Sequence, residues 1–415
     1  MMKRILARLS PDRGRELLFF AALTLPVGKT LSSTLAVLSA VSLAATRGQR
    51  LSERIRKDPL VWALSLLLGI FMAGLLHSED LHEGVKMVRK VLLLMGFYLL
   101  CSLHLRGWHD GRRVLLGFVI GMVAVNCLAI LRFFGLGGHA FVTPCSARMH
   151  HIWFGNLSAT AFYTSVIMAL ESERKPLLWI AALLTCSGVL LSASRGAWLA
   201  MASVLLLMVP ILVMRYRRWL AVLFLIASVG GVALAGRDLI VSRVEKALAE
   251  VSAFTSGEHN PSSVGDRLCM WYVCMRILRA HPWLGVGTGD YLVEARRLVQ
   301  HDPTLQHILH YNQPHNIYLH SLVMHGVIGF AGFMAVFAFM IFRAIRTLWS
   351  PLWSPGTIAL AALVHFLVAG LTEGVIRVHV MMASLGIFLG ATLSPPIMYN
   401  GGNGPQRANK TKGQG

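Results

Sequence analysis

Residues 316–342 read NIYLHSLVMHGVIGFAGFMAVFAFMIF and contain no Asp, Glu, Lys or Arg. A helix needs about 20 mostly apolar residues to cross the hydrocarbon core of a bilayer, where its backbone groups pair only with one another. This stretch therefore predicts a transmembrane helix. The whole chain has the same character, because 55% of its 415 residues are hydrophobic and only 14% are charged. Soluble domains carry about 25% charged residues, so we expect an all-α polytopic integral membrane protein.

Eleven further apolar segments bring the predicted number of transmembrane helices to about twelve. The twelve predicted spans lie near residues 17–28, 31–46, 60–76, 85–104, 114–134, 156–171, 177–193, 197–214, 219–236, 316–342, 357–373 and 380–394. We expect residues 1–399 to form a single transmembrane domain. The polar, Gly-rich residues 400–415 are typical of a disordered tail.

Lys and Arg are concentrated in one alternating set of short connections, which the positive-inside rule places in the cytoplasm. Because the number of spans is even, both termini and the tail are then cytoplasmic. The long connection 237–315 then faces the outside, which is the periplasm if the cell is a bacterium with two membranes. In such a cell we expect a multi-pass protein of the inner membrane. Within the long connection, residues 238–254 and 267–278 have helical spacing. Residues 284–290 resemble a nucleotide-binding loop only superficially, because they follow a helix and a proline, and we expect a turn.

The chain is strongly basic, with 39 Lys and Arg against 19 Asp and Glu and a formal net charge of +20. This excess favours anionic neighbours, such as the headgroups of membrane lipids or anionic substrates. Nucleic acid is not an expected partner, because the basic residues are dispersed between apolar segments and form no continuous patch.

Neither a metal ion nor another cofactor is expected. Six histidines occur between His301 and His325, but the chain has no HExxH sequence and Asp302 is the only acid nearby. The cysteines have neither zinc-ligand nor redox spacing, which leaves open a single disulfide outside the membrane. Glu373 and Arg377 stand at i, i+4 spacing, so we expect a structural ion pair. A role of Glu373 in orienting a histidine is the less favoured alternative.

His315 stands where the long connection re-enters the membrane as a helix, between Pro314 and Asn316. In a continuous helix, Gly326 lies about 20° from His315 around the axis and Gly329 about 40° to the other side. We therefore expect both glycines beneath the histidine, where a neighbouring helix can pack closely. A neutral imidazole at that edge could accept the proton of a hydroxyl as a general base. The alternative is an interfacial histidine that only caps or hydrogen-bonds.

Arg195 and Arg267 are candidates for binding an anion. Arg195 lies between two apolar spans at the outer edge, where a charge is costly unless it is paired or functional. Its planar fork suits phosphate oxygens. Arg267 opens a helix of the long connection, and the adjacent Asp266 could cap that helix or pair with Arg267. The alternative for Arg195 is a side chain that only extends to the membrane surface. The alternative for Arg267 is a solvated loop charge.

Three more cations, Lys86, Arg89 and Lys90, occur at the outer start of a span, against the positive-inside bias. Lys86 and Lys90 share a helix face at i, i+4 spacing, with Arg89 beside them. We expect an anion site, which Arg148 of the connection 135–155 could join. The alternative is again a set of cations that extend to the membrane surface.

The order and spacing of these motifs, from about residue 180 to 330, resemble the superfamily of O-antigen ligases, O-antigen polymerases and O-oligosaccharyltransferases. Residues 315–329, HNIYLHSLVMHGVIG, resemble the signature of bacterial O-antigen ligases. Residues 194–196, SRG, resemble the Ser-Arg-Gly motif of the superfamily. Residues 267–271, RLCMW, and 282–287, PWLGVG, are also similar to it.

The resemblance implies a member of the O-antigen ligase (WaaL) family, a metal-independent, inverting glycosyltransferase with a membrane fold of the GT-C type. It would transfer O-antigen polysaccharide from undecaprenyl pyrophosphate to the lipid A core on the periplasmic face, which completes lipopolysaccharide. Its partners would be the undecaprenyl-pyrophosphate-linked O-antigen, rough lipopolysaccharide and membrane lipids. The implied roles are catalysis by His315, pyrophosphate binding by Arg195, Arg267, Lys86, Arg89 and Lys90, and support by Asn316, Arg148 and Glu373.

Three alternatives stay open. A polymerase of the same superfamily would join two lipid-linked repeats and need no lipid A core. A protein O-oligosaccharyltransferase would act on a protein, and such enzymes are commonly longer. A transporter of lipid-linked glycans should place polar groups near the middle of the bilayer, whereas the polar clusters here collect at the outer edge.

Overall fold

The computed structural model describes residues 11–46, 53, 55–135, 143–147, 149–171, 175–215, 219–255, 264–351 and 353–394. Throughout these ranges the regular secondary structure is helical, with no strand. Each of the twelve predicted spans overlaps a helix. The twelve helices are α2 (Pro11–Thr24), α3 (Lys29–Thr46), α5 (Pro59–Leu75), α6 (Leu81–His104), α7 (Trp108–Phe133), α8 (His151–Glu171), α9 (Lys175–Leu191), α10 (Arg195–Pro210), α11 (Trp219–Ala235), α15 (Ile317–Leu348), α16 (Trp353–Ala369) and α17 (His379–Leu393).

Three helices are long and apolar enough to cross a membrane: α7, α15, and α10 with part of its π-helical continuation η1 (Ile211–Arg215). Shorter apolar helices occur at α3, α5, α9, α16 and α17. These helices support a membrane protein, whereas the number of twelve crossings stays a prediction. The expected tail 400–415 lies outside the described residues.

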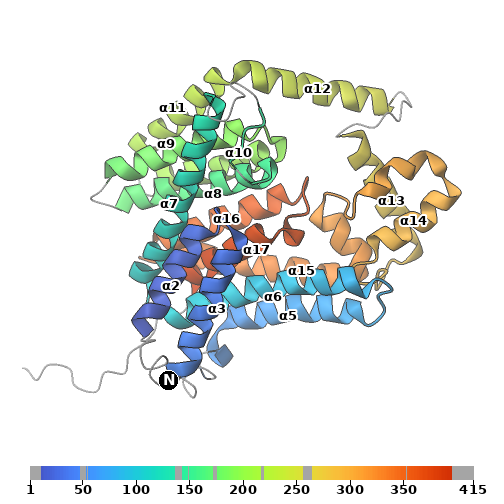
Figure 1. Ribbon diagram of the computed structural model, residues 1–415, viewed down its shortest axis with the longest axis horizontal. Helices are drawn as coiled ribbons and strands as arrows, with labels where there is room; N and C mark the ends of the chain where they lie inside the picture. The colour runs from blue at the N-terminus through green and yellow to red at the C-terminus, as the bar shows by residue number, and fades with distance from the viewer. Residues whose placement is uncertain are drawn as a thin grey trace, which may run out of the picture.

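Helix α17 lies at the centre of the bundle, beside α16 (Figure 1). From Val380 to Leu393 every residue of α17 is buried, as expected of a helix that is apolar on all sides. Its neighbours approach closely because small residues stand at the contacts. A Cβ atom at Gly386 would lie 2.5 Å from the carbonyl oxygen of Leu94 on α6.

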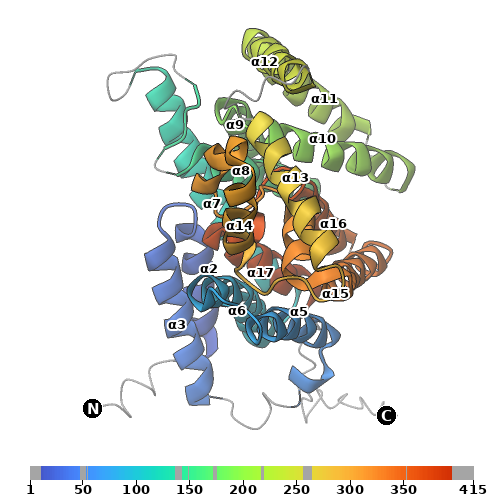
Figure 2. The same ribbon diagram turned by 90° about the vertical axis from the view of Figure 1, so that its right-hand side faces the viewer.

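The helices α13 (Gly265–Ala280) and α14 (Tyr291–His301) and the 3-10 helix η2 (Pro303–His310) pack together at one end of the bundle and are here called the cap. Helix α12 (Arg237–Thr255), which precedes them, runs lengthwise above α10 in Figure 1. In Figure 2 the cap faces the viewer, and α13 and α14 lie in front of α8, α16 and α17. The predicted helices at 238–254 and 267–278 and the predicted turn at 284–290 are confirmed.

The sequence did not predict α14 and η2, which share a small apolar core with α13. In α14 only Tyr291, Ala295 and Val299 are buried. A helix with such a short apolar stripe is hard to recognise, because periodicity is measured over windows of about 11–18 residues.

Helix α15 begins after His315, and it is interrupted along its length. Asn316 is its N-cap residue, and Gly326 interrupts it with a φ of 60° and a ψ of −170°. The prediction that Gly326 and Gly329 lie beneath His315 on one helix face is therefore wrong. The angle of 100° per residue applies only within an unbroken helix.

The turn 282–287 fills the interruption of α15. The Val327 backbone N–H donates to the carbonyl oxygen of Pro282 at 2.8 Å. A Cβ atom at Gly326 would lie 2.2 Å from the carbonyl carbon of Trp283, and the positive φ also favours glycine. The interruption thus fastens the cap to α15.

Candidate active site

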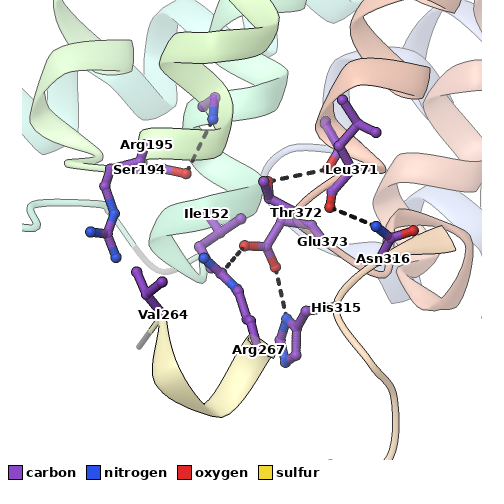
Figure 3. Close-up of polar contacts among 12 residues, drawn as sticks. Ile152, Ser194, Arg195, Val264, Arg267, His315, Asn316, Leu371, Thr372 and Glu373 are labelled. Atoms are coloured by element: carbon purple, nitrogen blue, oxygen red, sulfur yellow. Dashed lines mark hydrogen bonds and ion pairs between the residues drawn. The ribbon is translucent and has the colours of Figure 1, made fainter. Parts of the chain in front are cut away.

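Four chain segments meet at the junction between the cap and the bundle (Figure 3). They are the start of α10, the start of α13, the residues before α15 and the turn after α16. Figure 3 shows that they carry Arg195, Arg267, His315 and Glu373 respectively. Polar side chains from distant parts of the sequence are therefore gathered where the apolar bundle ends.

Glu373 is the residue that joins this group. Its Oε1 accepts a hydrogen bond from Arg267 Nη2 at 2.7 Å, and its Oε2 lies 3.1 Å from Nδ1 of His315. The Glu373 side chain is only 8% exposed. A carboxylate so buried requires charged or hydrogen-bonding partners to offset its lost hydration. One buried acid therefore fixes an arginine and a histidine relative to each other.

The expected ion pair between Glu373 and Arg377 is absent, so that prediction is wrong. The residues between α16 and the short 3-10 helix η3 (Val375–Arg377) form a turn, in which i, i+4 side chains do not share a face. Arg377 instead lies 2.7 Å from Glu83 of α6, which also pairs with Lys86. The contact of Glu373 with a histidine, the less favoured alternative, is the one observed.

His315 lies immediately before α15, and its φ is 49°. A positive φ is uncommon for residues other than glycine and persists where the surroundings fix the backbone. An ionised Glu373 can only accept hydrogen bonds, so the neutral imidazole carries its hydrogen on Nδ1. The lone pair of Nε2 is then available as a proton acceptor, which is the arrangement that a general base requires.

Neighbouring residues hold the backbone of His315 on both sides. Trp271 Nε1 of α13 donates to the carbonyl oxygen of Pro314 at 3.0 Å. The Asn316 side chain accepts from the backbone N–H groups that open α15, and its Nδ2 donates to the carbonyl oxygen of Leu371 at 3.1 Å. Asn316 thus caps the helix and ties it to the turn that carries Glu373.

Arg195 is the first residue of α10, whose N-cap is Ser194. Its Nη2 lies 3.9 Å from Oε2 of Glu250 on α12. A Cβ atom at Gly196 would lie 2.4 Å from Thr372 Oγ1. The glycine of the SRG sequence therefore permits the start of α10 to approach the turn that carries Glu373.

The remaining predicted cations stand apart from this group. Arg89 and Lys90 have no acidic partner in the described part of the chain. Neither contacts Glu373 or His315 within the described ranges. The predicted contribution of Arg148 falls outside the described residues.

A metal centre is not evident in the described residues, where no three His, Cys, Asp or Glu side chains come close enough to hold one ion. The histidines of the His-rich stretch point to different neighbours. His325 lies 3.1 Å from Thr288 Oγ1, for example, whereas His320 packs edge-on against Tyr291. All six cysteines of the chain are free thiols.

Two residues of this region were not singled out from the sequence. Glu250 reaches Arg195 from the polar face of α12, and Tyr311 packs edge-on against the ring of His315. The helical spacing of residues 238–254 places Glu250 on a predicted helix, but nothing in the sequence indicated which cation it meets. Tyr311 lies in an irregular segment, where no periodicity indicates which side chains are buried.

Comparison with known proteins finds similarity in the segments that carry three of these residues. A family model described as O-antigen ligase matches residues 180–334, which include the starts of α10 and α13 and His315. A protein of Haemophilus influenzae strain Rd, described only as an uncharacterized protein, is 22% identical over 348 residues, which cover 80% of this chain and 84% of that protein. The family match supports a membrane enzyme of the superfamily of O-antigen ligases and polymerases.

Proposed function

We propose that the protein is an O-antigen ligase, which transfers O-antigen polysaccharide from undecaprenyl pyrophosphate to a sugar hydroxyl of the lipid A core. The observation that carries the proposal is the contact of one buried carboxylate, Glu373, with both Arg267 and His315. A cation suited to a diphosphate leaving group then lies beside an oriented imidazole. A general base and preorganised cationic donors each accelerate such a transfer from a diphosphate.

In the proposed reaction, the acceptor hydroxyl oxygen bonds to the anomeric carbon of the donor sugar while the bond from this carbon to the diphosphate oxygen breaks. The hydroxyl proton passes to Nε2 of His315. The electron pair of the broken bond leaves with the diphosphate. Attack from the side opposite the leaving group inverts the configuration at the anomeric carbon.

Arg195 and Arg267 bind the diphosphate oxygens in this proposal. An arginine has five N–H donors, so Arg267 can hold Glu373 with one and still donate to a diphosphate with others. Preorganised donors of this kind stabilise the departing charge without a metal ion. Lys86, Arg89 and Lys90 assist by attracting the anionic lipid substrates.

We also propose the membrane arrangement that this reaction needs. The single transmembrane domain, residues 1–399, crosses the bacterial inner membrane twelve times with a fold of the GT-C type. Both termini lie in the cytoplasm, and the centre around His315 faces the periplasm, where lipid-linked O-antigen and rough lipopolysaccharide meet. Lipid tails of both substrates then remain in the bilayer beside the site.

The proposal is tested with the full-length protein in lipid nanodiscs. Polyprenyl-pyrophosphate-linked glycan is supplied with or without rough lipopolysaccharide, and products are separated by size. A ligase produces glycan-bearing lipopolysaccharide only when rough lipopolysaccharide is present, and the His315→Ala variant produces it about 100- to 10,000-fold more slowly.

Other outcomes identify the alternatives. Longer lipid-linked glycans formed without rough lipopolysaccharide would indicate a polymerase. Transfer only to an added protein acceptor would indicate an O-oligosaccharyltransferase. Movement of intact donor across a vesicle membrane without glycosyl transfer would indicate a transporter and would remove the proposed catalytic role of His315.

A further inference from the structure

The ring of His315 has a second neighbour besides Glu373. The ring centroids of Tyr311 and His315 are 5.4 Å apart and their planes are perpendicular. Such edge-to-face contacts are a preferred geometry of aromatic pairs. A hydrogen bond at Nδ1 alone fixes one atom of the imidazole and lets the ring pivot about it, so a neighbour against the ring restricts that motion.

Tyr311 is itself held in place. Its hydroxyl donates to Oδ2 of Asp266 at 2.9 Å, and the Asp266 side chain is 9% exposed. His307 Nε2 lies 3.6 Å from the other carboxylate oxygen of Asp266. Burial and the bond to Asp266 raise the pKa of Tyr311 to about 12. The raised pKa keeps the phenol protonated well above neutral pH, so it remains a donor to Asp266.

The contacts on both sides of His315 lead back to the first turns of α13. Arg267 holds Glu373, which meets Nδ1 of His315, and the adjacent residue Asp266 holds Tyr311, which meets the ring. One turn further along, Trp271 donates to the carbonyl oxygen of the residue before His315. The start of α13 thus contacts the histidine segment in three ways: through the carboxylate of Glu373, through the ring of Tyr311 and through the backbone of Pro314.

We propose that Asp266 and Tyr311 are positioning residues of the transfer reaction, which hold the imidazole of His315 so that Nε2 is directed at the acceptor hydroxyl. The inference rests on the proposed role of His315 as general base. It extends that role from the carboxylate Glu373 to a second, independent support. Because the reacting atoms must be aligned, a displacement of about 1 Å can lower a rate roughly 100-fold.

The test compares three variants of the full-length protein in nanodiscs, with glycan-pyrophosphate donor and rough lipopolysaccharide. Tyr311→Leu removes the ring and should lower kcat about 10- to 100-fold with little change in KM for the donor. Tyr311→Phe keeps the ring and loses only the bond to Asp266, so it should retain more activity than Tyr311→Leu. Tyr272→Leu is the matched control, because Tyr272 is a half-exposed tyrosine of α13 whose hydroxyl accepts a hydrogen bond from Arg276 of the same helix.

A second measurement separates positioning from a merely structural role. In the His315→Ala background, Tyr311→Leu should leave the residual transfer rate unchanged, because the residue that it positions is gone. Wild-type kcat in Tyr311→Leu would overturn the inference. So would a loss of activity that appears as a raised KM, that persists in the His315→Ala background, or that accompanies a lowered melting temperature of Tyr311→Phe and Tyr311→Leu alike.

The same assay distinguishes this inference from the proposed function. If the wild type elongates lipid-linked glycan instead of modifying rough lipopolysaccharide, the ligase proposal fails. The order wild type, Tyr311→Phe, Tyr311→Leu in kcat for elongation would still support the positioning role, whereas equal rates would overturn it. If the wild type transfers no glycan to any acceptor, both proposals fail.

Discussion

The cations around His315 and those at the start of α6 look alike in the sequence but have different surroundings. Arg267 shares the buried carboxylate Glu373 with a histidine. Lys86 shares Glu83 with another cation, so that acid is satisfied by charges alone. The difference teaches that cations with similar sequence contexts can have different partners, and only the acid Glu373 joins a cation to an imidazole, as the proposed reaction requires.

The two groups also differ in how firmly they are held. Arg267 belongs to α13. His315 is connected to the same helix through Glu373, which Arg267 holds, and through Pro314, which accepts a hydrogen bond from Trp271. Arg89 is exposed and Lys90 half-buried, and neither has an acidic partner in the residues that the structure describes. We therefore expect substitutions in the first group to change the rate of the chemical step. Substitutions in the second should change the capture of anionic lipids.

The largest effect is expected for His315→Ala. A general base contributes about 100- to 10,000-fold to a rate, so transfer should fall by that factor while the protein still folds and inserts. Glycan transfer at matched expression in membranes measures this. His301→Ala, which changes an exposed histidine at the end of α14, is the control. Wild-type transfer by His315→Ala would leave His315 with a structural role only.

Glu373→Gln should follow, with a loss of about 100-fold or more. Two charge-assisted contacts end at this carboxylate, and each is worth ~1.5–3 kcal/mol. Glu83→Gln is the matched variant in the α6 group and should change the rate by no more than about 5-fold, the worth of a partly exposed ion pair. Equal losses in the two variants would contradict the distinction between the groups.

Arg195 and Arg267 are expected to tolerate Lys poorly, because Lys keeps the charge but loses the bidentate fork. Each Arg→Ala change should remove a contact worth ~1.5–3 kcal/mol, or roughly 10- to 100-fold in transfer. The double variant should depart from additivity if both residues bind one diphosphate. Near-wild-type transfer by both Arg→Lys variants would remove the pyrophosphate clamp from the mechanism.

A smaller effect is expected when Arg89 and Lys90 are changed to Gln. Each cation near a membrane surface contributes about 1 kcal/mol to attraction of anionic lipid. KM for the lipid-linked donor should therefore rise by roughly 5-fold for each change, with kcat unaffected. The effect should shrink as salt is added, because salt screens exposed charges. A fall in kcat with an unchanged KM would place these residues in the reaction centre after all.

No effect is expected from removal of divalent metal ions. The proposed leaving-group stabilisation uses N–H donors of Arg195 and Arg267, which need no metal. Transfer should therefore proceed unchanged in EDTA. Loss of transfer in EDTA that one divalent ion restores would overturn metal independence and return attention to the His-rich stretch between His301 and His325.

The sequence located the helices of this protein well. Each predicted span overlaps a helix, and two predicted helices of the long connection are present. Hydropathy and helical periodicity are properties of contiguous residues, so they can be read without knowledge of the fold. The same approach missed α14, because the apolar stripe of this helix is too short to produce a clear periodicity.

The sequence singled out three residues that the structure brings to one junction. Arg195 drew attention because a charge at a membrane edge is costly unless it is paired or functional. Arg267 drew attention at the start of a helix, and His315 where the long connection re-enters the membrane. The partner of Glu373 was wrongly predicted, because i, i+4 spacing implies contact only if the helix continues, and the chain turns there instead. The prediction that Gly326 lies beneath His315 was wrong for the same reason, because it also assumed a continuous helix and α15 breaks at that glycine.

The sequence by itself determined which segments are apolar enough to be helices in or beside a membrane and which polar residues stand at their ends. Only the tertiary structure decided that Glu373 meets Arg267 and His315, and that Asp266 reaches His315 through Tyr311. Burial in lipid depends on the local composition of a segment. Ion pairs and ring contacts between distant segments depend instead on where helices break and how they pack, and these are properties of the whole fold.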